Sequence, residues 1–329
     1  MIDKIIKRLK VIFDDFIIDS KYFSFKLAIV RFINNVTCRG RFLKKINKWS
    51  VNEKHKLILN YLSINYADII NKYKSEEESA EYLDKQNIWV CWLQGEKNAP
   101  QLVKNCIDSI RCHSNGHEVI IISRDNFSRY IDIPNYILDK YDKGIISHAH
   151  FSDIIRMSLL CAHGGIWIDA TVFCSKDLPH SIFEKTFFSC KGPFVETDYI
   201  SGMQWTSFIL GGKRNSLLYR YILDFYFQYW KNEDYAIDYL FMDYMIYLAY
   251  NNIKNIKKAI DQNEINNTRR DGLYNIFNQK FSLDKYKNFL DSDTYLYKLS
   301  WRETFDSKTT DGKDTFYNVF INKYSETFS

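Results

Sequence analysis

The chain has 329 residues, of which 46% are apolar and 26% charged, and this is the composition of a folded globular protein. Its 12 glycines and 4 prolines are too few for a collagen-like or low-complexity chain. No apolar run approaches the roughly 18 residues that a bilayer-spanning helix needs, and no secretory apolar region follows the N-terminus, so we expect a cytoplasmic protein.

The positive charge is concentrated near the N-terminus. The whole chain has a formal net charge of +5, but residues 1–50 contain twelve Lys or Arg against four Asp, a local +8, so the rest sums to −3. Within this basic segment, apolar residues recur at three- and four-residue steps over residues 2–17. This spacing predicts an amphipathic helix.

The predicted helix at residues 2–17 has two interpretations, and both stay open. Its apolar stripe can insert at the inner face of the cell membrane, where each basic residue contributes about 1 kcal/mol of attraction to anionic lipid. Alternatively, the stripe packs on the protein's own core. A nucleic-acid partner is not expected, because no zinc finger, RNA-recognition motif or extended Lys/Arg run accompanies the basic segment.

The sequence predicts two parts. Helical spacing from Lys54 to Tyr73, followed by an acidic polar stretch, indicates a helical N-terminal extension over residues 1–86. Residues 87–329 have the pattern of an α/β domain. Three short apolar runs in it predict buried parallel strands, at residues 88–93, 119–122 and 166–169.

Helices are predicted between these strands. One begins at Ala99-Pro100, and another begins at Ser147 or His148 and ends at Gly164-Gly165. The order predicts a Rossmann-like α/β fold with a mixed, mainly parallel sheet flanked by helices, and a ligand site at the carboxyl ends of the strands. Further strands are predicted at residues 187–190, 205–210 and 295–301, and further helices at about 215–230 and 235–250.

Three charged residues are predicted to meet at this sheet edge. Asp153 and Arg156 are three apart on a helix and share a face, and the strand after the glycine turn delivers Asp169 to its own carboxyl end. An acid in such a place needs a partner, and Mg²⁺ or Mn²⁺ shared with a diphosphate is one. The alternative without a functional role is an ordinary surface ion pair between Asp153 and Arg156.

These motifs resemble those of the capsular polysaccharide synthesis protein family, relatives of family 32 glycosyltransferases. The resemblance rests on the Ser-Asp-x-x-Arg helix ending at Arg156, the Gly-Gly-x-Trp-x-Asp turn ending at Asp169, and Trp92-Leu-Gln-Gly95 followed by Ala99-Pro100, and it covers about residues 86–250. It implies a GT-A-like fold with a DXD-type sugar-nucleotide site.

The resemblance also implies an activity. The expected enzyme is a retaining glycosyltransferase that moves a sugar from a UDP- or GDP-sugar to a hydroxyl of a capsular or other surface polysaccharide. Its acceptor would be a glycan or a lipid-linked oligosaccharide. Carried over by position, Asp153 and Arg156 contact the ribose and diphosphate, and Asp169 binds Mn²⁺ or Mg²⁺, which makes Arg156 and Asp169 the expected catalytic residues.

The other donor-binding residues that the resemblance implies are Trp89, Trp92, Gln94, Gly95, Gly165, Thr171, Ser300 and Trp301. Thr171 stands where a second carboxylate is common, which leaves the need for metal open. It also leaves open the alternative of a catalytically degenerate nucleotide-sugar-binding or scaffold protein in a polysaccharide assembly complex. Leu299-Ser-Trp-Arg302 resembles the Ser-Trp element with which related toxin glucosyltransferases close over the donor phosphates.

Overall fold

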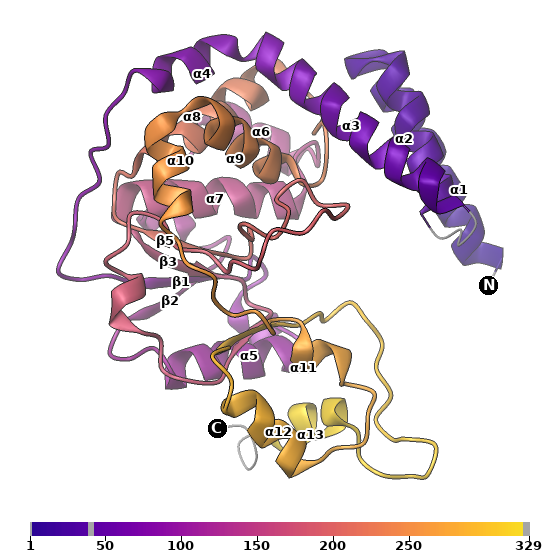
Figure 1. Ribbon diagram of the computed structural model, residues 1–329, viewed down its shortest axis with the longest axis vertical. Helices are drawn as coiled ribbons and strands as arrows, with labels where there is room; N and C mark the ends of the chain where they lie inside the picture. The colour runs from indigo at the N-terminus through magenta and orange to yellow at the C-terminus, as the bar shows by residue number, and fades with distance from the viewer. Residues whose placement is uncertain (1, 39–42, 325–329) are drawn as a thin grey trace.

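A four-stranded sheet forms the centre of the fold. The computed structural model describes residues 2–38 and 43–324, and in it the strands lie in the order β2 (Val119–Ile122), β1 (Ile88–Cys91), β3 (Gly165–Ile168) and β5 (Ile209–Gly212). Strand β1 runs parallel to both β2 and β3, whereas β5 runs antiparallel to β3. The predicted mixed sheet flanked by helices is confirmed (Figure 1).

Both faces of the sheet are covered. Trp89 and Cys91 of β1 point into one core with α7 (His148–His163), while Ile88 and Val90 point into a second core with α5 (Gln101–Cys112). Figure 1 shows these two helices on opposite sides of the sheet. Burial on both faces explains why the strands read as uninterrupted apolar runs.

A second layer of helices lies outside α7. It consists of α6 (Asn135–Asp142), α8 (Leu217–Asn232), α9 (Phe241–Asn252) and α10 (Lys254–Asp261). Aromatic side chains of α8 and α9 fill the space between the layers, with Tyr229 against Phe241 at 4.2 Å between ring centroids. Short 3-10 helices occur at Glu96–Asn98, Phe127–Arg129 and His180–Ile182.

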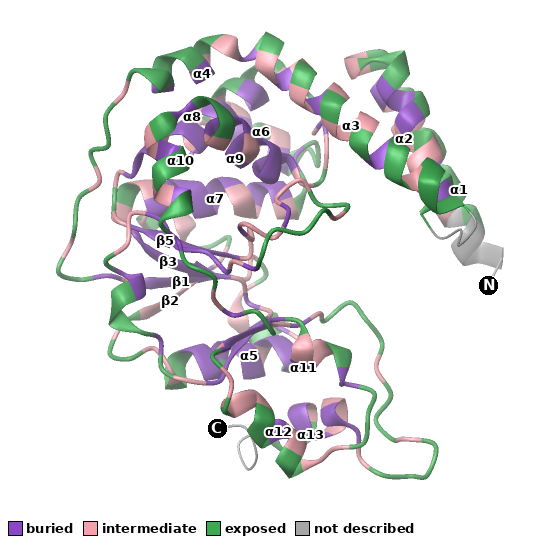
Figure 2. Ribbon diagram, in the orientation of Figure 1, coloured by how far each residue is buried: buried purple, intermediate pink, exposed green. Residues whose placement is uncertain are grey.

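The N-terminal residues form an extended row of helices. These are α1 (Ile2–Ile18), a π-helical turn (Asp19–Phe23), α2 (Phe25–Thr37), α3 (Lys44–Asn65) and α4 (Ala67–Lys74). Ile58 and Leu62 of α3 and Ile70 of α4 belong to the main core. Helices α1 and α2 extend away from the sheet, and their surface is largely exposed or half-buried (Figures 1 and 2).

The C-terminal region brings a second, small sheet under the first. Strand β4 (Val172–Cys174) pairs antiparallel with β6 (Leu296–Lys298), and α11 (Gly272–Asn275), α12 (Leu283–Leu290) and α13 (Phe316–Asn322) pack beside it. A third apolar core joins these elements to Leu102 of α5 and Phe173 of β4. Because β4 begins three residues after Asp169, this pairing places β6 next to the carboxyl end of β3.

Several predicted elements differ from the structure. The predicted strand at 187–190 is only a single bridge between Phe188 and Gly211, and the next strand begins at Ile209 and runs through both glycines. The predicted helix at 235–250 begins at Phe241, because the preceding residues form a loop that Arg31 binds at the carbonyl oxygen of Ile237. The strand predicted at 295–301 ends at Lys298. Across the described ranges, no helix combines the length and apolarity of a membrane span.

We expect Gly165→Ala to unfold the centre of the sheet. Gly165 has φ +88°, and an added Cβ would collide with the carbonyl oxygen of Asn87 on the chain leading into β1. The free energy of unfolding in urea should fall by more than about 3 kcal/mol. Gly144→Ala is the matched control, because Gly144 also has positive φ, at +72°, but nothing lies within 4 Å of its added Cβ. It should cost only about 1 kcal/mol; equal losses in the two variants would contradict the close approach.

Candidate active site

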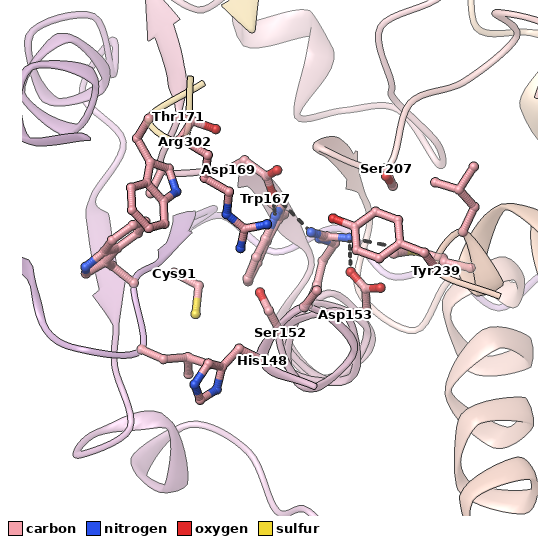
Figure 3. Close-up of a pocket in the computed structure, with 18 of the residues that line it drawn as sticks. Cys91, His148, Ser152, Asp153, Trp167, Asp169, Thr171, Ser207, Tyr239 and Arg302 are labelled. Atoms are coloured by element: carbon pink, nitrogen blue, oxygen red, sulfur yellow. Dashed lines mark hydrogen bonds and ion pairs between the residues drawn. The ribbon is translucent and has the colours of Figure 1, made fainter. Parts of the chain in front are cut away.

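A cavity of about 270 Å³ opens at the carboxyl ends of β1 and β3 (Figure 3). This is the edge at which parallel α/β sheets generally bind ligands. Seven residues expected from the sequence line it: Trp92, Gln94, Asp153, Arg156, Asp169, Thr171 and Trp301. A neighbouring cavity of about 350 Å³ shares Thr171 and Trp301 and adds Ser300 and Lys298.

Arg156 holds two carboxylates together at the floor of the cavity. Its Nη1 donates to Asp153 Oδ1 at 2.8 Å, and its Nη2 donates to Asp169 Oδ1 at 3.0 Å. The guanidinium also stacks over Trp167, 4.7 Å from the ring centroid. Its side chain is 5% exposed, so the alternative of an ordinary surface ion pair is wrong. A buried ion network of this kind fixes the geometry of the carboxylates.

Asp169 receives hydrogen bonds on both oxygens. Besides Arg156, Oδ1 accepts from Trp167 Nε1 at 2.9 Å, and Oδ2 accepts from Lys298 Nζ at 2.8 Å. Removal from water raises the pKa of Asp169, but the charges of Lys298 and Arg156 outweigh this effect and hold the pKa below its usual range. Asp169 is therefore an ionised, immobilised carboxylate.

Lys298 is a site residue that the sequence did not reveal. It is 129 positions from Asp169, and only the pairing of β6 with β4 brings the two together. The available signal was its place immediately before Leu299-Ser-Trp-Arg302. Sequence spacing alone cannot show that the β6 strand lies beside Thr171.

Asp243 of α9 also lines the cavity, and its carboxyl group is buried. It accepts a hydrogen bond from Trp205 Nε1 at 2.8 Å. The pKa of Asp243 is raised to about 7, chiefly by burial and also by the nearby Asp153 charge, against the opposing effect of the Trp205 hydrogen bond. Burial also raises the pKa of Asp153, although Arg156 opposes the shift. Of the three carboxyl groups that line the cavity, Asp169 has a lowered pKa, whereas Asp153 and Asp243 have raised ones.

Aromatic rings and a second cation line the outer part of the cavity. The rings of Trp92 and Trp301 meet edge to face at 5.6 Å between centroids. The side chain of Arg302 reaches in beside Asp169 (Figure 3). Arg302 is exposed and pairs with no carboxylate in the described part of the chain, so its charge faces the cavity. The arrangement offers flat apolar surfaces next to uncompensated positive charge.

Three residues expected to bind the donor do not line the cavity. Trp89 is 1% exposed, and its Nε1 donates to the carbonyl oxygen of Gly164 at 2.9 Å, because it is the second residue of β1 and lies away from the carboxyl end, where the cavity opens. Gly165 is needed for the close approach to Asn87, and Gly95, with φ +81°, lines neither of the two cavities. The expectation that these residues contact the donor is corrected accordingly.

The residues at Asp169 do not fit a resident divalent cation. Mg²⁺ and Mn²⁺ need several oxygen ligands with free lone pairs at about 2.0–2.2 Å. Both Asp169 oxygens are bound by cationic groups, and Thr171 Oγ1 accepts from Lys298 Nζ at 2.8 Å. Within residues 2–38 and 43–324, no group of three His, Cys, Asp or Glu side chains is arranged to hold a metal ion. The expectation of Mn²⁺ or Mg²⁺ stays a prediction.

We expect Asp243→Asn to change how stability depends on pH. With a pKa of about 7 in the folded state and 3.8 as the ordinary value, Asp243 contributes stability while protonated, and this contribution is lost as the pH rises toward and through 7. Asparagine keeps the acceptor for Trp205 but cannot ionise. The free energy of unfolding of the wild type should therefore fall relative to the variant by about 2 kcal/mol between pH 5 and pH 8. Parallel urea-unfolding profiles would contradict the assignment, and exposed Asp132→Asn should run parallel to the wild type.

The chain is similar in sequence and in structure to glycosyltransferases. An O-glycosyltransferase from Annulohypoxylon truncatum, braB, is 30% identical over 116 residues, which is 30% of this chain and 28% of that protein, so the chain spans less than a third of this relative. The PaToxG glycosyltransferase structure aligns with 66% of this chain and 83% of its own, at a TM-score of 0.36 and 17% identity. The family model described as capsular polysaccharide synthesis protein matches residues 39–320. The chain therefore belongs to the capsular polysaccharide synthesis protein family.

Proposed function

We propose that the protein is a retaining glycosyltransferase of GT-A-like fold that moves a sugar from a nucleoside-diphosphate donor, a UDP- or GDP-sugar, to a hydroxyl of a surface polysaccharide. Membership of the capsular polysaccharide synthesis family supports a sugar donor and a glycan acceptor. The observation that carries the proposal is the immobilised Asp169, bracketed by Arg156 and Lys298, at the carboxyl end of a parallel strand. Parallel sheets of α/β proteins bind nucleotides at this edge.

The contents of the cavity match the parts of such a donor. Trp92 and Trp301 offer aromatic faces for a base, and Arg302 offers positive charge for a diphosphate. Arg156 is a positioning residue, because its guanidinium is taken up by Asp153 and Asp169 and its side chain is 5% exposed. It keeps both carboxylates in fixed places along the cavity.

The proposed chemistry is stabilisation of the leaving group. The bond between the anomeric carbon and the diphosphate oxygen breaks while the acceptor oxygen bonds to the same carbon. The acceptor attacks from the face that the diphosphate leaves, which retains the anomeric configuration. The acceptor proton passes to an oxygen of the departing diphosphate, so no side-chain base is required. Preorganised cations at the diphosphate stabilise the charge that develops on it.

We expect Asp169→Asn to abolish turnover. Purified protein should slowly hydrolyse one donor in a screen of UDP- and GDP-sugars, and loss of the negative charge that orients Lys298 and Arg156 should reduce that rate by about 100-fold or more. Release of UDP or GDP, with and without Mn²⁺, measures the rate. Asp132→Asn is the matched control, because Asp132 is an exposed carboxylate outside the cavity and its loss should leave the rate unchanged.

The same screen distinguishes a catalytically degenerate binding or scaffold protein, which Thr171 in place of a second carboxylate favours. Such a protein would bind a nucleotide sugar without turning it over. Binding without hydrolysis or transfer, for every donor and with every glycan acceptor tried, would contradict the proposed enzyme and leave a nucleotide-sugar-binding role.

We propose further that the N-terminal helices hold the enzyme on the inner face of an anionic membrane, where a lipid-linked acceptor resides. Four apolar side chains of α1 lie on one exposed face, namely Ile6, Leu9, Phe13 and Ile17, each at least 48% exposed. A matching stripe on α2 consists of Phe25, Ile29, Phe32 and Val36, each at least 39% exposed.

The two apolar stripes adjoin. Phe16 of α1 contacts Phe25 and Phe32 of α2, at 6.0 and 6.2 Å between ring centroids, which joins the helices along these faces. In the sequence, residues 1–50 carry a local charge of +8. An apolar face flanked by cations is the pattern of helices that lie in an anionic lipid interface. The exposure of Ile6, Leu9, Phe13 and Ile17 supports this interpretation over packing of the stripe on the protein's own core.

We expect Leu9→Glu/Phe13→Glu to release the protein from lipid. Wild-type protein should sediment with vesicles of phosphatidylglycerol and phosphatidylcholine, and the two added negative charges should leave most of the variant in the supernatant. Ile64→Glu is the matched control, since Ile64 is 65% exposed on α3, outside both stripes. Equal sedimentation of Leu9→Glu/Phe13→Glu and wild type would contradict the membrane contact.

A further inference from the structure

Backbone pairing fixes Lys298 beside the Asp169-Ala-Thr171 segment. Lys298 lies opposite Val172 in the antiparallel pair of β6 and β4, and the amide of Leu299 donates to the carbonyl oxygen of Thr171 at 2.9 Å. The amide of Lys298 itself donates to the carbonyl oxygen of Arg270 at 2.8 Å. The position of this lysine is thus set by the sheet, and its ammonium is not a freely moving surface charge.

The ammonium lies between the first and third residues of that segment. Lys298 Nζ is 2.8 Å from Asp169 Oδ2 and 2.8 Å from Thr171 Oγ1. A divalent cation held by these two oxygen atoms would have to share this position with the ammonium. Like charges so close together repel strongly where water is scarce, so the two cations exclude each other.

The ammonium also has capacity left for a ligand. A lysine ammonium has three donors, and Asp169 and Thr171 take two of them. The side chain of Lys298 is 28% exposed, and it lines the cavity that Thr171, Trp301 and Arg302 share with the candidate active site. One N–H of Lys298 and the guanidinium of Arg302 can therefore face a single bound anion.

We propose that Lys298 takes the place of the divalent cation, so that the protein binds the diphosphate of its donor without metal, through the ammonium of Lys298 and the guanidinium of Arg302. This inference rests on the proposed function, and it names the group that neutralises the leaving diphosphate. In this arrangement the carboxylate of Asp169 orients the ammonium of Lys298. The proposal also explains why Thr171 can stand where a second carboxylate is common, because an ammonium needs one counter-charge and a divalent cation needs more.

Titration calorimetry with UDP and with GDP tests the proposal. Wild-type protein is titrated in excess EDTA and again with Mn²⁺ in place of EDTA, at constant ionic strength. The nucleotide that binds should do so with dissociation constants equal within about twofold in the two buffers, and Lys298→Met should bind at least about tenfold more weakly in EDTA. Lys257→Met is the matched control, because Lys257 is half exposed, pairs with Asp261 and lies outside both cavities. The affinity of this variant for the nucleotide should equal that of the wild type.

The outcomes separate this inference from the proposed function. Binding by wild type only when Mn²⁺ is present would overturn the role of Lys298 and leave the glycosyltransferase proposal intact, and this comparison requires no variant. Undiminished affinity of Lys298→Met in EDTA would also overturn it. Arg302→Met, at an exposed position that should not disturb folding, should likewise bind at least about tenfold more weakly. Failure of both nucleotides to bind wild type in either buffer would overturn the proposed function and this inference together.

Discussion

The candidate site depends on one carboxylate that joins three separate parts of the chain. Asp169 ends the third strand of the main sheet, Arg156 comes from the helix that covers that sheet, and Lys298 comes from the small second sheet. Removing the carboxylate would leave a buried guanidinium and an ammonium without their shared counter-charge. Such losses in buried ion networks are costly, so the same contacts hold the C-terminal region against the core and shape the cavity.

The order of secondary structure could be predicted where the apolar pattern was unambiguous. Three strands lie between two layers of the structure, namely Ile88–Cys91, Val119–Ile122 and Gly165–Ile168. Runs of branched and aromatic residues between polar loops predict such strands. Elements that depend on distant partners could not be placed in this way. Strand β5 includes Gly211 and Gly212, whose weak strand preference is overcome by pairing with Gly165 and Ile166. The short helices α11, α12 and α13 pack on a third core that no local pattern describes.

The residues of the candidate site likewise fall into those that local sequence predicts and those that only the tertiary structure reveals. The spacing of Asp153, Arg156 and Asp169 along one helix and the next strand is local information, and the structure brings these three side chains together. Lys298 and Asp243 are joined to them only by tertiary packing. Trp89 was expected at the carboxyl end of its strand, but it is the second residue of β1 and is buried. Sequence reasoning identified the carboxylate correctly as a residue in need of a cation; the fold supplies a lysine at that position.

The most direct test is a crystal structure of the protein with bound UDP or GDP, grown with Mn²⁺ present. The account predicts the diphosphate in the cavity at the carboxyl ends of β1 and β3, with a phosphate oxygen within hydrogen-bonding distance of Lys298 Nζ and of Arg302, and with Lys298 still bound to Asp169 and Thr171. A manganese ion between Asp169 and Thr171 with Lys298 displaced, or a nucleotide bound elsewhere on the protein, would contradict it.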